Sequence, residues 1–218
     1  MIADIKLRQD VRIAAVERDL VILDISGDTY SCLPEAAQAW SDFEAGSGSA
    51  QAEAIAAALL DGGLAERGAR RTPVPRPPSL PSECCLDGQQ DRLRWSDIVA
   101  LTGSYLDYRF RYEGRTFAQI LKFVRRPGRA SVSGKSDAEL YRLSRTFQRL
   151  VIWLPAPGKC LVRSFLLLRF LQRSGADAIW VFGVETWPFE AHCWLQKGEV
   201  VLDDRPERVA AYEPIHAV

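Results

Sequence analysis

The chain has 218 residues, of which 47% are hydrophobic and 26% are charged, a composition typical of a soluble globular protein. Its 28 basic residues balance its 28 acidic residues, so the basic surplus expected of a nucleic-acid-binding protein is absent. No apolar stretch reaches the ~20 residues that span a membrane, and charged residues interrupt the start of the chain, so we expect neither a membrane helix nor a secretory signal.

The N-terminal region has the pattern of a small mixed unit. Residues 11–13, 20–25 and 29–33 are rich in strand-forming side chains and are separated by turn signals. Helices are predicted over residues 36–43, after Pro34, and over residues 52–60. We therefore predict a first domain over residues 1–66, with an open edge at its last long strand.

A proline- and arginine-rich segment follows at residues 67–82. Proline at this density disfavours both helix and sheet and favours an extended, fairly stiff spacer. The arginines could bind an acidic partner, but a solvated linker explains them as well. We predict that this linker leads into a second domain over residues 83–218.

The second domain begins with helical periodicity. Apolar residues recur at helical spacing from Trp95 to Tyr108, over residues 117–124 and over residues 137–153. A further helix is predicted from Cys160 to Gly175. Because its residues are apolar around most of its circumference, this helix is expected to be buried.

Cys160 is the leading candidate for a catalytic residue because it opens this buried helix. The start of a helix carries partial positive charge and free N–H groups, which favour a thiolate and can hold an oxyanion. A cysteine in an apolar helix is more often an inert core residue. The catalytic interpretation gains weight because a histidine and an acidic pair follow in chain order.

That histidine is His192, on a strand predicted over residues 191–196. A turn at Lys197-Gly198 sets His192 opposite Asp203 if the loop has two residues, and opposite Asp204 if it has three. Both lengths are common, so the pattern leaves the choice of acid open. Strand alternation directs Cys193 away from His192, which indicates a structural cysteine.

The remaining histidine and cysteines limit the chemistry further. His216, near the end of the chain, is expected to be exposed. The odd number of cysteines and the adjacent pair Cys84 and Cys85 argue against a disulfide framework and for a reduced, cytoplasmic protein. Their spacing does not fit a zinc site, and the chain lacks a phosphate-binding G-x-x-x-x-G-K motif, so neither a metal nor a cofactor is expected.

At these residues the chain resembles a known family. The runs 183–189, 192–195 and 198–204, with the helix that starts at Cys160, resemble the lasso-peptide leader peptidases. Their protease domain has a transglutaminase-like or papain-like fold. Residues 19–31 resemble the precursor-recognition domain of this family, which is winged-helix-like and similar to the small chaperone of pyrroloquinoline-quinone synthesis. The fold class implied is α+β.

The resemblance implies a function and a set of site residues. It implies a cysteine endopeptidase that cleaves a ribosomally made lasso-peptide precursor between leader and core, so that the core can be cyclised. By position, its nucleophile falls on Cys160, its base on His192 and its acid on Asp204, although Asp203 stays an alternative. The leader would add as a strand to the edge formed by Thr29, Tyr30 and Leu33. The implied partners are the precursor peptide and an asparagine-synthetase-like cyclase.

Three alternatives use the same features differently. The chain could be a non-catalytic adaptor that delivers the precursor to another enzyme, which predicts an unreactive Cys160. It could be a DNA-binding regulator, because a winged-helix-like unit is also found in such proteins, but the balanced charge opposes this. It could transfer an acyl group to an amine, in which case the product would be an isopeptide.

Overall fold

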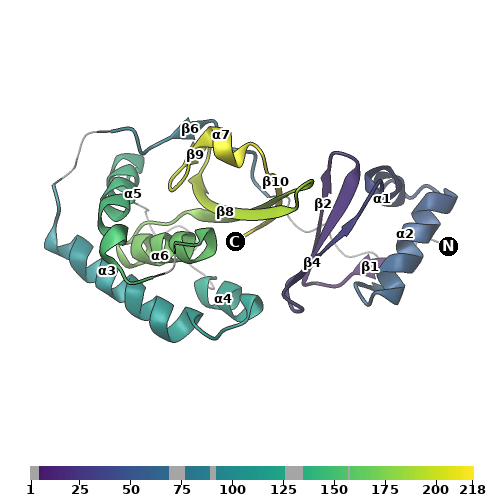
Figure 1. Ribbon diagram of the computed structural model, residues 1–218, viewed down its shortest axis with the longest axis horizontal. Coiled ribbons are helices and arrows are strands. Elements are labelled where there is room, and N and C mark those ends of the chain that lie inside the picture. The colour runs from purple at the N-terminus through teal and green to yellow at the C-terminus, as the bar shows by residue number, and fades with distance from the viewer. Residues whose placement is uncertain (1–4, 69–76, 89–91, 126–134, 157) are drawn as a thin grey trace. The chain divides into compact units, whose positions relative to one another are not determined.

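The computed structural model describes residues 5–68, 77–88, 92–125, 135–156 and 158–218. The chain divides into two compact units: Met1–Arg76 with Val184–Glu190, and Pro77–Gly183 with Ala191–Val218. Figure 1 labels elements of both. Much of the linker predicted at residues 67–82 lies outside the described residues. In the described part of the chain, no helix combines the length and the apolar character needed to cross a membrane.

The first unit is built on a three-stranded antiparallel sheet in the order β2-β3-β4. Its strands are β2 (Val11–Val16), β3 (Asp19–Asp24) and β4 (Thr29–Leu33). The central strand β3 is buried along most of its length, as its run of apolar residues predicts. Within the described residues β4 pairs only with β3 and therefore forms an edge of this sheet.

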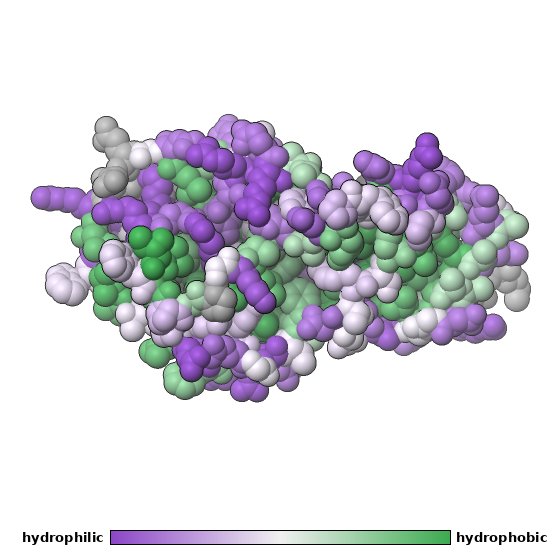
Figure 2. All heavy atoms as spheres, viewed as in Figure 1, coloured by the Kyte–Doolittle hydropathy of each residue, from purple (hydrophilic) through white to green (hydrophobic). Residues whose placement is uncertain are grey.

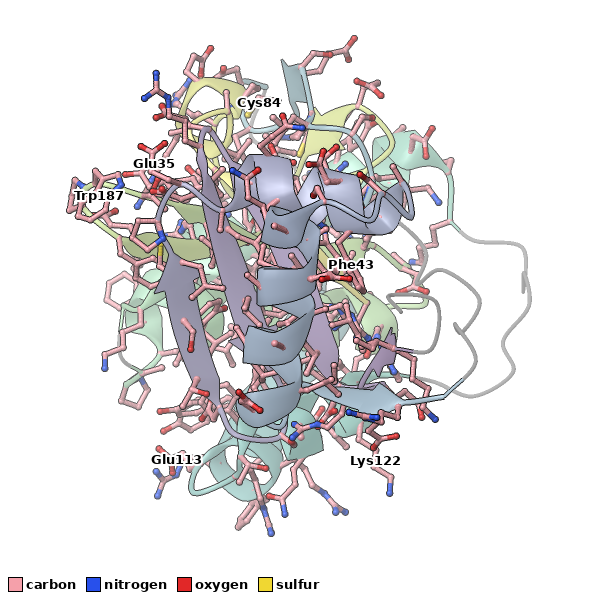
Figure 3. All side chains as sticks on the ribbon, turned by 90° about the vertical axis from the view of Figure 1, so that its right-hand side faces the viewer. Glu35, Phe43, Cys84, Glu113, Lys122 and Trp187 are labelled. Atoms are coloured by element: carbon pink, nitrogen blue, oxygen red, sulfur yellow. The ribbon has the colours of Figure 1, made fainter. Side chains whose placement is uncertain are left out.

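Two helices complete the core of this unit. Figure 3 shows α2 (Ala50–Asp61) lying lengthwise over the strands, with Phe43 of α1 (Ala37–Glu44) beside it. Ser49 caps α2 by accepting a hydrogen bond from the Ala52 N–H. Each fully buried Leu, Ile or Phe contributes about 1.5–3 kcal/mol to folding. The core residues are Val11, Leu20, Ile22, Phe43, Ala52, Ile55, Ala56, Leu59 and Ala65.

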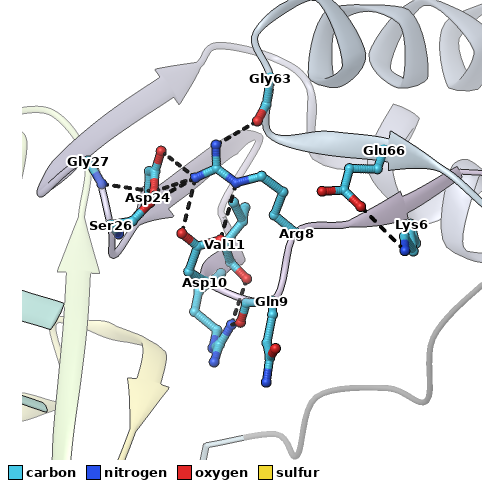
Figure 4. A network of polar contacts seen from close by, with 11 residues as sticks. Lys6, Arg8, Gln9, Asp10, Val11, Asp24, Ser26, Gly27, Gly63 and Glu66 are labelled. Carbon is cyan, nitrogen blue, oxygen red and sulfur yellow. Dashed lines mark hydrogen bonds and ion pairs between the residues drawn. The ribbon is translucent and has the colours of Figure 1, made fainter. Parts of the chain in front are cut away.

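Arg8 attaches a two-stranded antiparallel ribbon to the rest of this unit. Strand β1 (Ile5–Leu7) pairs with β5 (Ala65–Arg67), and Arg8 follows directly after β1. The Arg8 guanidinium donates to the Asp10 and Asp24 carboxylates and to the Gly63 carbonyl oxygen, as Figure 4 shows. These bonds fix the ribbon to the end of β3 and to the turn after α2. The sequence pattern did not predict β1, whose pairing partner lies about sixty residues further along the chain.

The second unit contains a five-stranded sheet in the order β10-β7-β8-β9-β6. Its fully or nearly buried core includes Val181, Trp194, Val201, Val209 and Tyr212. Figure 2 shows hydrophilic residues gathered over the short helix α7 (Pro206–Val209) on the face in view. The strands are β6 (Glu83–Cys84), β7 (Ile179–Glu185), β8 (Glu190–Lys197), β9 (Val200–Val201) and β10 (Glu213–Ala217).

Four longer helical segments of the described residues accompany this sheet, and α6 is the most deeply buried. From Phe165 to Leu171 its apolar side chains are at most 2% exposed, which confirms the prediction of a buried helix. The segments are α3 (Trp95–Asp107), which continues as the π-helix η2 (Tyr108–Tyr112), α4 (Phe117–Val124), α5 (Asp137–Leu150), which ends in the 3-10 turn η3 (Val151–Trp153), and α6 (Cys160–Arg173).

Two buried aspartates, Asp97 and Asp107, hold α3 against its neighbours through ion pairs. Asp97 accepts two hydrogen bonds from Arg142 of α5, at 2.9 and 3.0 Å. Asp107 accepts from Arg169 and Arg173 of α6, at 2.8 and 2.9 Å. Burial opposes ionisation of both aspartates, but the hydrogen bonds from the arginines hold the pKa of each below its ordinary value. Both ends of α3 are therefore fixed by paired charges.

The prediction that His216 is exposed is wrong. His216 lies on β10, where its side chain is buried and its ring stacks on Phe182 at 5.9 Å. The end of the chain continues the sheet, because Trp180 and Val218 exchange backbone hydrogen bonds of 2.8 and 2.9 Å. A terminal position predicts exposure only when no strand pairing ties the terminus down.

Candidate active site

Cys160 is the first residue of α6. The preceding Lys159 has an extended backbone conformation, so the chain enters the helix directly at the cysteine. Cys160 is partly exposed, whereas the following turns of α6 are buried. The thiol thus lies at the positive end of the helix, beside N–H groups that have no acceptor within it.

His192 lies on β8 and interacts with the Cys160 thiol. Its side chain is 5% exposed, and its ring lies 5.0 Å from the Tyr212 ring and 6.2 Å from the Trp194 ring. The Nε2 atom is 2.6 Å from Oδ2 of Asp204. Because Nε2 contacts the carboxylate, Nδ1 is the nitrogen left to face the thiol.

The hairpin after β8 distinguishes the two aspartates. Lys197 pairs with Val200, and Gln196 pairs with Val201, so the turn consists of Gly198 and Glu199. Gly198 has φ +57°, a value that glycine adopts without strain in a two-residue hairpin turn. Both turns predicted from the sequence are therefore wrong, because each began the loop at Lys197.

Asp203 and Asp204 consequently lie beyond the paired residues. Leu202 still donates its N–H to the Leu195 carbonyl oxygen, and the Asp203 carboxylate then accepts the Leu195 N–H at 2.8 Å. Asp203 thus closes the end of the hairpin. Asp204 is the aspartate that reaches His192, and its own backbone carbonyl oxygen accepts a hydrogen bond from the Cys84 thiol at 3.5 Å.

Cys193 also contacts Cys160, which strand alternation alone did not suggest. Its thiol and its backbone N–H both interact with the Cys160 thiol and favour its ionised form. The alternation itself is present, because the Cys193 sulfur lies 3.2 Å from the Ser164 hydroxyl on α6 while the His192 ring lies beside Tyr212. The first turn of α6 brings Cys160 within reach of both neighbouring side chains on β8.

Ser164 completes this group of side chains and was missed by the sequence reasoning. It is fully buried, and its hydroxyl oxygen accepts a hydrogen bond from the Trp180 indole N–H at 2.9 Å. It also donates to the Cys160 carbonyl oxygen at 2.8 Å. The available signal was its spacing, because a residue four positions after Cys160 lies on the same face of the helix.

The contacts change the protonation of each group. Hydrogen bonds from Cys193 and from His192 lower the pKa of Cys160 to about 4 despite its partial burial. Burial alone would lower the pKa of His192, but hydrogen bonds to Asp204 and Cys160 raise it to about 9. Burial also opposes the charge of Asp204, yet the bond to His192 holds its pKa below the ordinary value. Near neutral pH the site therefore contains a thiolate, an imidazolium and a carboxylate.

This arrangement can perform nucleophilic chemistry at a carbonyl. A thiolate is the reactive form of cysteine, and an adjacent imidazolium can protonate a leaving group. The third group orients the imidazole through its other nitrogen. Among the described residues, no cluster of three or more His, Cys, Asp or Glu side chains is arranged to hold a metal ion.

The residues predicted to bind substrate lie on β4 of the first unit. Thr29 is exposed, and Tyr30 is partly buried. Leu33 is also partly buried and packs against the core of that unit, so its side chain supports the fold. Along β4, the backbone is therefore better placed than the Leu33 side chain to contact an added strand.

The second unit matches a known family. The model described as the transglutaminase-like superfamily matches residues 103–217, which is more than half of the chain and includes Cys160, His192 and Asp204. The microcin J25-processing protein McjB of Escherichia coli is 43% identical over 47 residues, which cover 22% of this chain and 23% of that protein. The matched part thus spans about a quarter of this relative's length. No solved structure gives a significant match.

Proposed function

Because the chain belongs to the transglutaminase-like superfamily, we propose that it is a cysteine endopeptidase that removes the leader from a lasso-peptide precursor. The observation that carries this proposal is the contact of the Cys160 thiol with His192, whose Nε2 lies 2.6 Å from Asp204. The name of the relative from Escherichia coli denotes a processing role, and the match to it covers 47 residues.

In the proposed reaction, the Cys160 thiolate attacks the carbonyl carbon at the junction between leader and core. N–H groups at the start of α6 stabilise the oxyanion that forms. The His192 imidazolium gives its proton to the departing core amine, so the peptide bond breaks and a thioester to the leader remains. Neutral His192 then takes a proton from water, which hydrolyses the thioester and frees the leader and the thiolate.

Asp204 keeps His192 in the orientation and charge state that these steps need. Its short hydrogen bond to Nε2 turns Nδ1 toward the sulfur and stabilises the imidazolium. Arg208 of α7 lies 3.7 Å from the same carboxylate oxygen and favours its ionised form. Asp203, which is bound to the backbone at Leu195, is assigned a structural role at the hairpin.

We further propose that the first unit is the precursor-recognition domain, with β4 as the strand to which the leader adds. An edge strand offers a row of backbone donors and acceptors, which accounts for binding with limited dependence on side chains. Tethering the leader to the same chain as Cys160 raises the local concentration of the scissile bond. The freed core would pass to an asparagine-synthetase-like cyclase, and the setting would be the cytoplasm.

The test is to mix the purified protein with its precursor and follow the products by mass spectrometry. The wild type is expected to release the intact leader and the core. The Cys160→Ala variant should still bind the precursor, because β4 is unchanged, but should leave it uncut. Cleavage by this variant would disprove the mechanism. An isopeptide-linked product would identify acyl transfer to an amine, and uncut precursor with the wild type would favour a non-catalytic adaptor.

A further inference from the structure

The active site contains a second thiol that the proposed hydrolysis does not require. Cys193 shares the buried neighbour Ser164 with Cys160, and its thiol and backbone N–H interact with the Cys160 thiol. Ser164 lies against both residues, with its hydroxyl 3.2 Å from the Cys193 sulfur and 2.8 Å from the Cys160 carbonyl oxygen. The two cysteines are thus held side by side by α6 and β8, and both are reduced.

The two thiols differ in exposure and in reactivity. Cys160 is partly exposed and is stabilised as a thiolate, which is the form that reacts with peroxides. Cys193 is 4% exposed, and its burial raises its pKa well above the ordinary thiol value. A small oxidant would therefore react first with the more exposed Cys160 sulfur. The protonated thiol of Cys193 lies next to that sulfur.

We propose that Cys160 and Cys193 form a peroxide-sensitive thiol pair, whose disulfide reversibly inactivates the enzyme. The role as a switch rests on the proposed peptidase function, because a disulfide removes the nucleophile of that reaction. The oxidant is hydrogen peroxide or an organic hydroperoxide. The pairing itself depends only on the contact between the two side chains.

The chemistry proceeds in two balanced steps. The Cys160 thiolate attacks one peroxide oxygen, the O–O bond breaks, and the leaving oxygen takes a proton to give water or an alcohol. Cys160 is then a sulfenic acid. The Cys193 sulfur attacks the Cys160 sulfur, the S–O bond breaks, and the hydroxide leaves as water with the proton of the Cys193 thiol. Two electrons pass from the two thiols to one peroxide.

The remaining cysteines are poorer candidates for this reaction. Burial raises the pKa of Cys85 to about 12 and that of Cys32 above its ordinary value. Cys84 and Cys85 are adjacent in sequence, but their thiols donate to different carbonyl oxygens, those of Asp204 and Leu202. We therefore expect the first disulfide to form between Cys160 and Cys193.

The experiment treats the full-length protein with a small excess of hydrogen peroxide, blocks the remaining thiols by alkylation and digests with trypsin. Fragments 160–163 and 174–197 contain these two cysteines separately, because Lys159, Arg163, Arg173 and Lys197 are cleavage points. The expected product is the two fragments joined, with the loss of two hydrogen atoms, and dithiothreitol should separate them. The same treatment in urea should abolish the preference for a disulfide between Cys160 and Cys193.

Cys193→Ser is the informative variant, because a hydroxyl keeps a donor beside Cys160 but cannot form a disulfide. Peroxide should convert its Cys160 to the sulfinic acid, a gain of two oxygen atoms that dithiothreitol does not reverse. Precursor cleavage is then measured after peroxide treatment followed by dithiothreitol, as a fraction of the activity of the untreated protein. The wild type should recover most of its activity, and Cys193→Ser should recover little. The control Cys84→Ser should respond to both reagents as the wild type does.

The outcomes separate this proposal from the proposed function. Sulfinic acid at Cys160 of the wild type, without the joined fragments, would overturn the thiol pair. A disulfide that joins Cys160 to a cysteine other than Cys193 would overturn it as well. If the joined fragments form but the untreated protein cuts no precursor, the pair stands as an oxidation site, and its role as a peptidase switch is disproved.

Discussion

At the scale of single residues, the charges of Cys160 and His192 depend on their mutual contact. The pKa of the thiol is lowered to about 4 and that of the imidazole is raised to about 9. Below the first value the nucleophile is protonated, and above the second the proton needed by the leaving amine is lost. We therefore predict a bell-shaped dependence of kcat/KM on pH, with limbs near these values.

Alkylation tests the acid limb of this profile without a substrate. At about pH 6, more than two units below the ordinary thiol pKa of about 8.5, Cys160 should still react rapidly with iodoacetamide. His192→Gln removes the imidazolium, so its Cys160 should react more slowly at this pH. A wild-type alkylation midpoint near the ordinary thiol pKa would contradict the ion pair.

The two neighbouring aspartates should respond differently to the same substitution. Asp204→Asn removes the negative charge at 2.6 Å from His192 and should lower kcat by about 10²-fold or more. Asp203→Asn keeps an oxygen that can accept the Leu195 N–H, so its loss should be about fivefold at most, or ~1 kcal/mol. The measurement is kcat for precursor cleavage.

A thermal-unfolding curve for each aspartate variant serves as the control for folding. Equal losses of activity in the two variants would show that neither carboxylate has the special role assigned to Asp204. A larger loss in Asp203→Asn would transfer that role to Asp203, the alternative that the sequence left open.

Much of the candidate site could be predicted from residue types and their order. Only two histidines are present, and only His192 lies on a strand that follows the cysteine helix closely. The choice between Asp203 and Asp204 could not be made from turn length, because the chain leaves the paired strands before reaching either. The roles of Ser164 and Cys193 depend on which face of the sheet α6 covers, and local periodicity does not contain that information.

At the scale of elements, long periodic segments were predictable and short polar ones were not. The helix from Cys160 was found because its apolar residues recur over four turns. Strands β1, β6 and β10 were missed because they have two to five residues and each depends on a partner distant in sequence. Glu83 and Cys84, for example, form a strand only by pairing with Val200 and Val201.

Helix α3 provides a prediction about stability. Removing one partner of the buried pair between Asp97 and Arg142 leaves an uncompensated charge, so Asp97→Ala should cost about 3–5 kcal/mol in urea unfolding. The matched control is the double variant Asp97→Ala with Arg142→Met, which removes both charges and should recover much of this loss. Additive effects of the two substitutions would argue against the pair.

The pH dependence of the same pair has a definite sign. Since the pKa of Asp97 is lower in the folded protein than its ordinary value of 3.8, its contribution is complete above that value. This contribution is lost as the pH falls through the lower, folded value. The difference in unfolding free energy between wild type and Asp97→Ala should therefore shrink in strong acid.

At the scale of the whole molecule, the two units have different support. The family match begins at residue 103 and thus lies mainly in the second unit. The role of the first unit is inferred only from its sequence pattern and from the edge strand of its sheet. Composition and the linker signal predicted two domains, with boundaries at residues 66 and 82. Recognition of the leader by the first unit remains a prediction, and it requires a test that separates binding from cleavage.

Backbone-modified leaders provide this test. In a strand added to β4, successive backbone N–H groups point alternately toward β4 and away from it. Methylating alternate leader amides gives two peptides of equal composition, and only one of them loses its donors to β4. We predict that one methylated precursor has a raised KM with little change in kcat, because the reacting bond is untouched, while the other behaves like the unmodified precursor. If both are cut with an unchanged KM, strand addition at β4 is wrong.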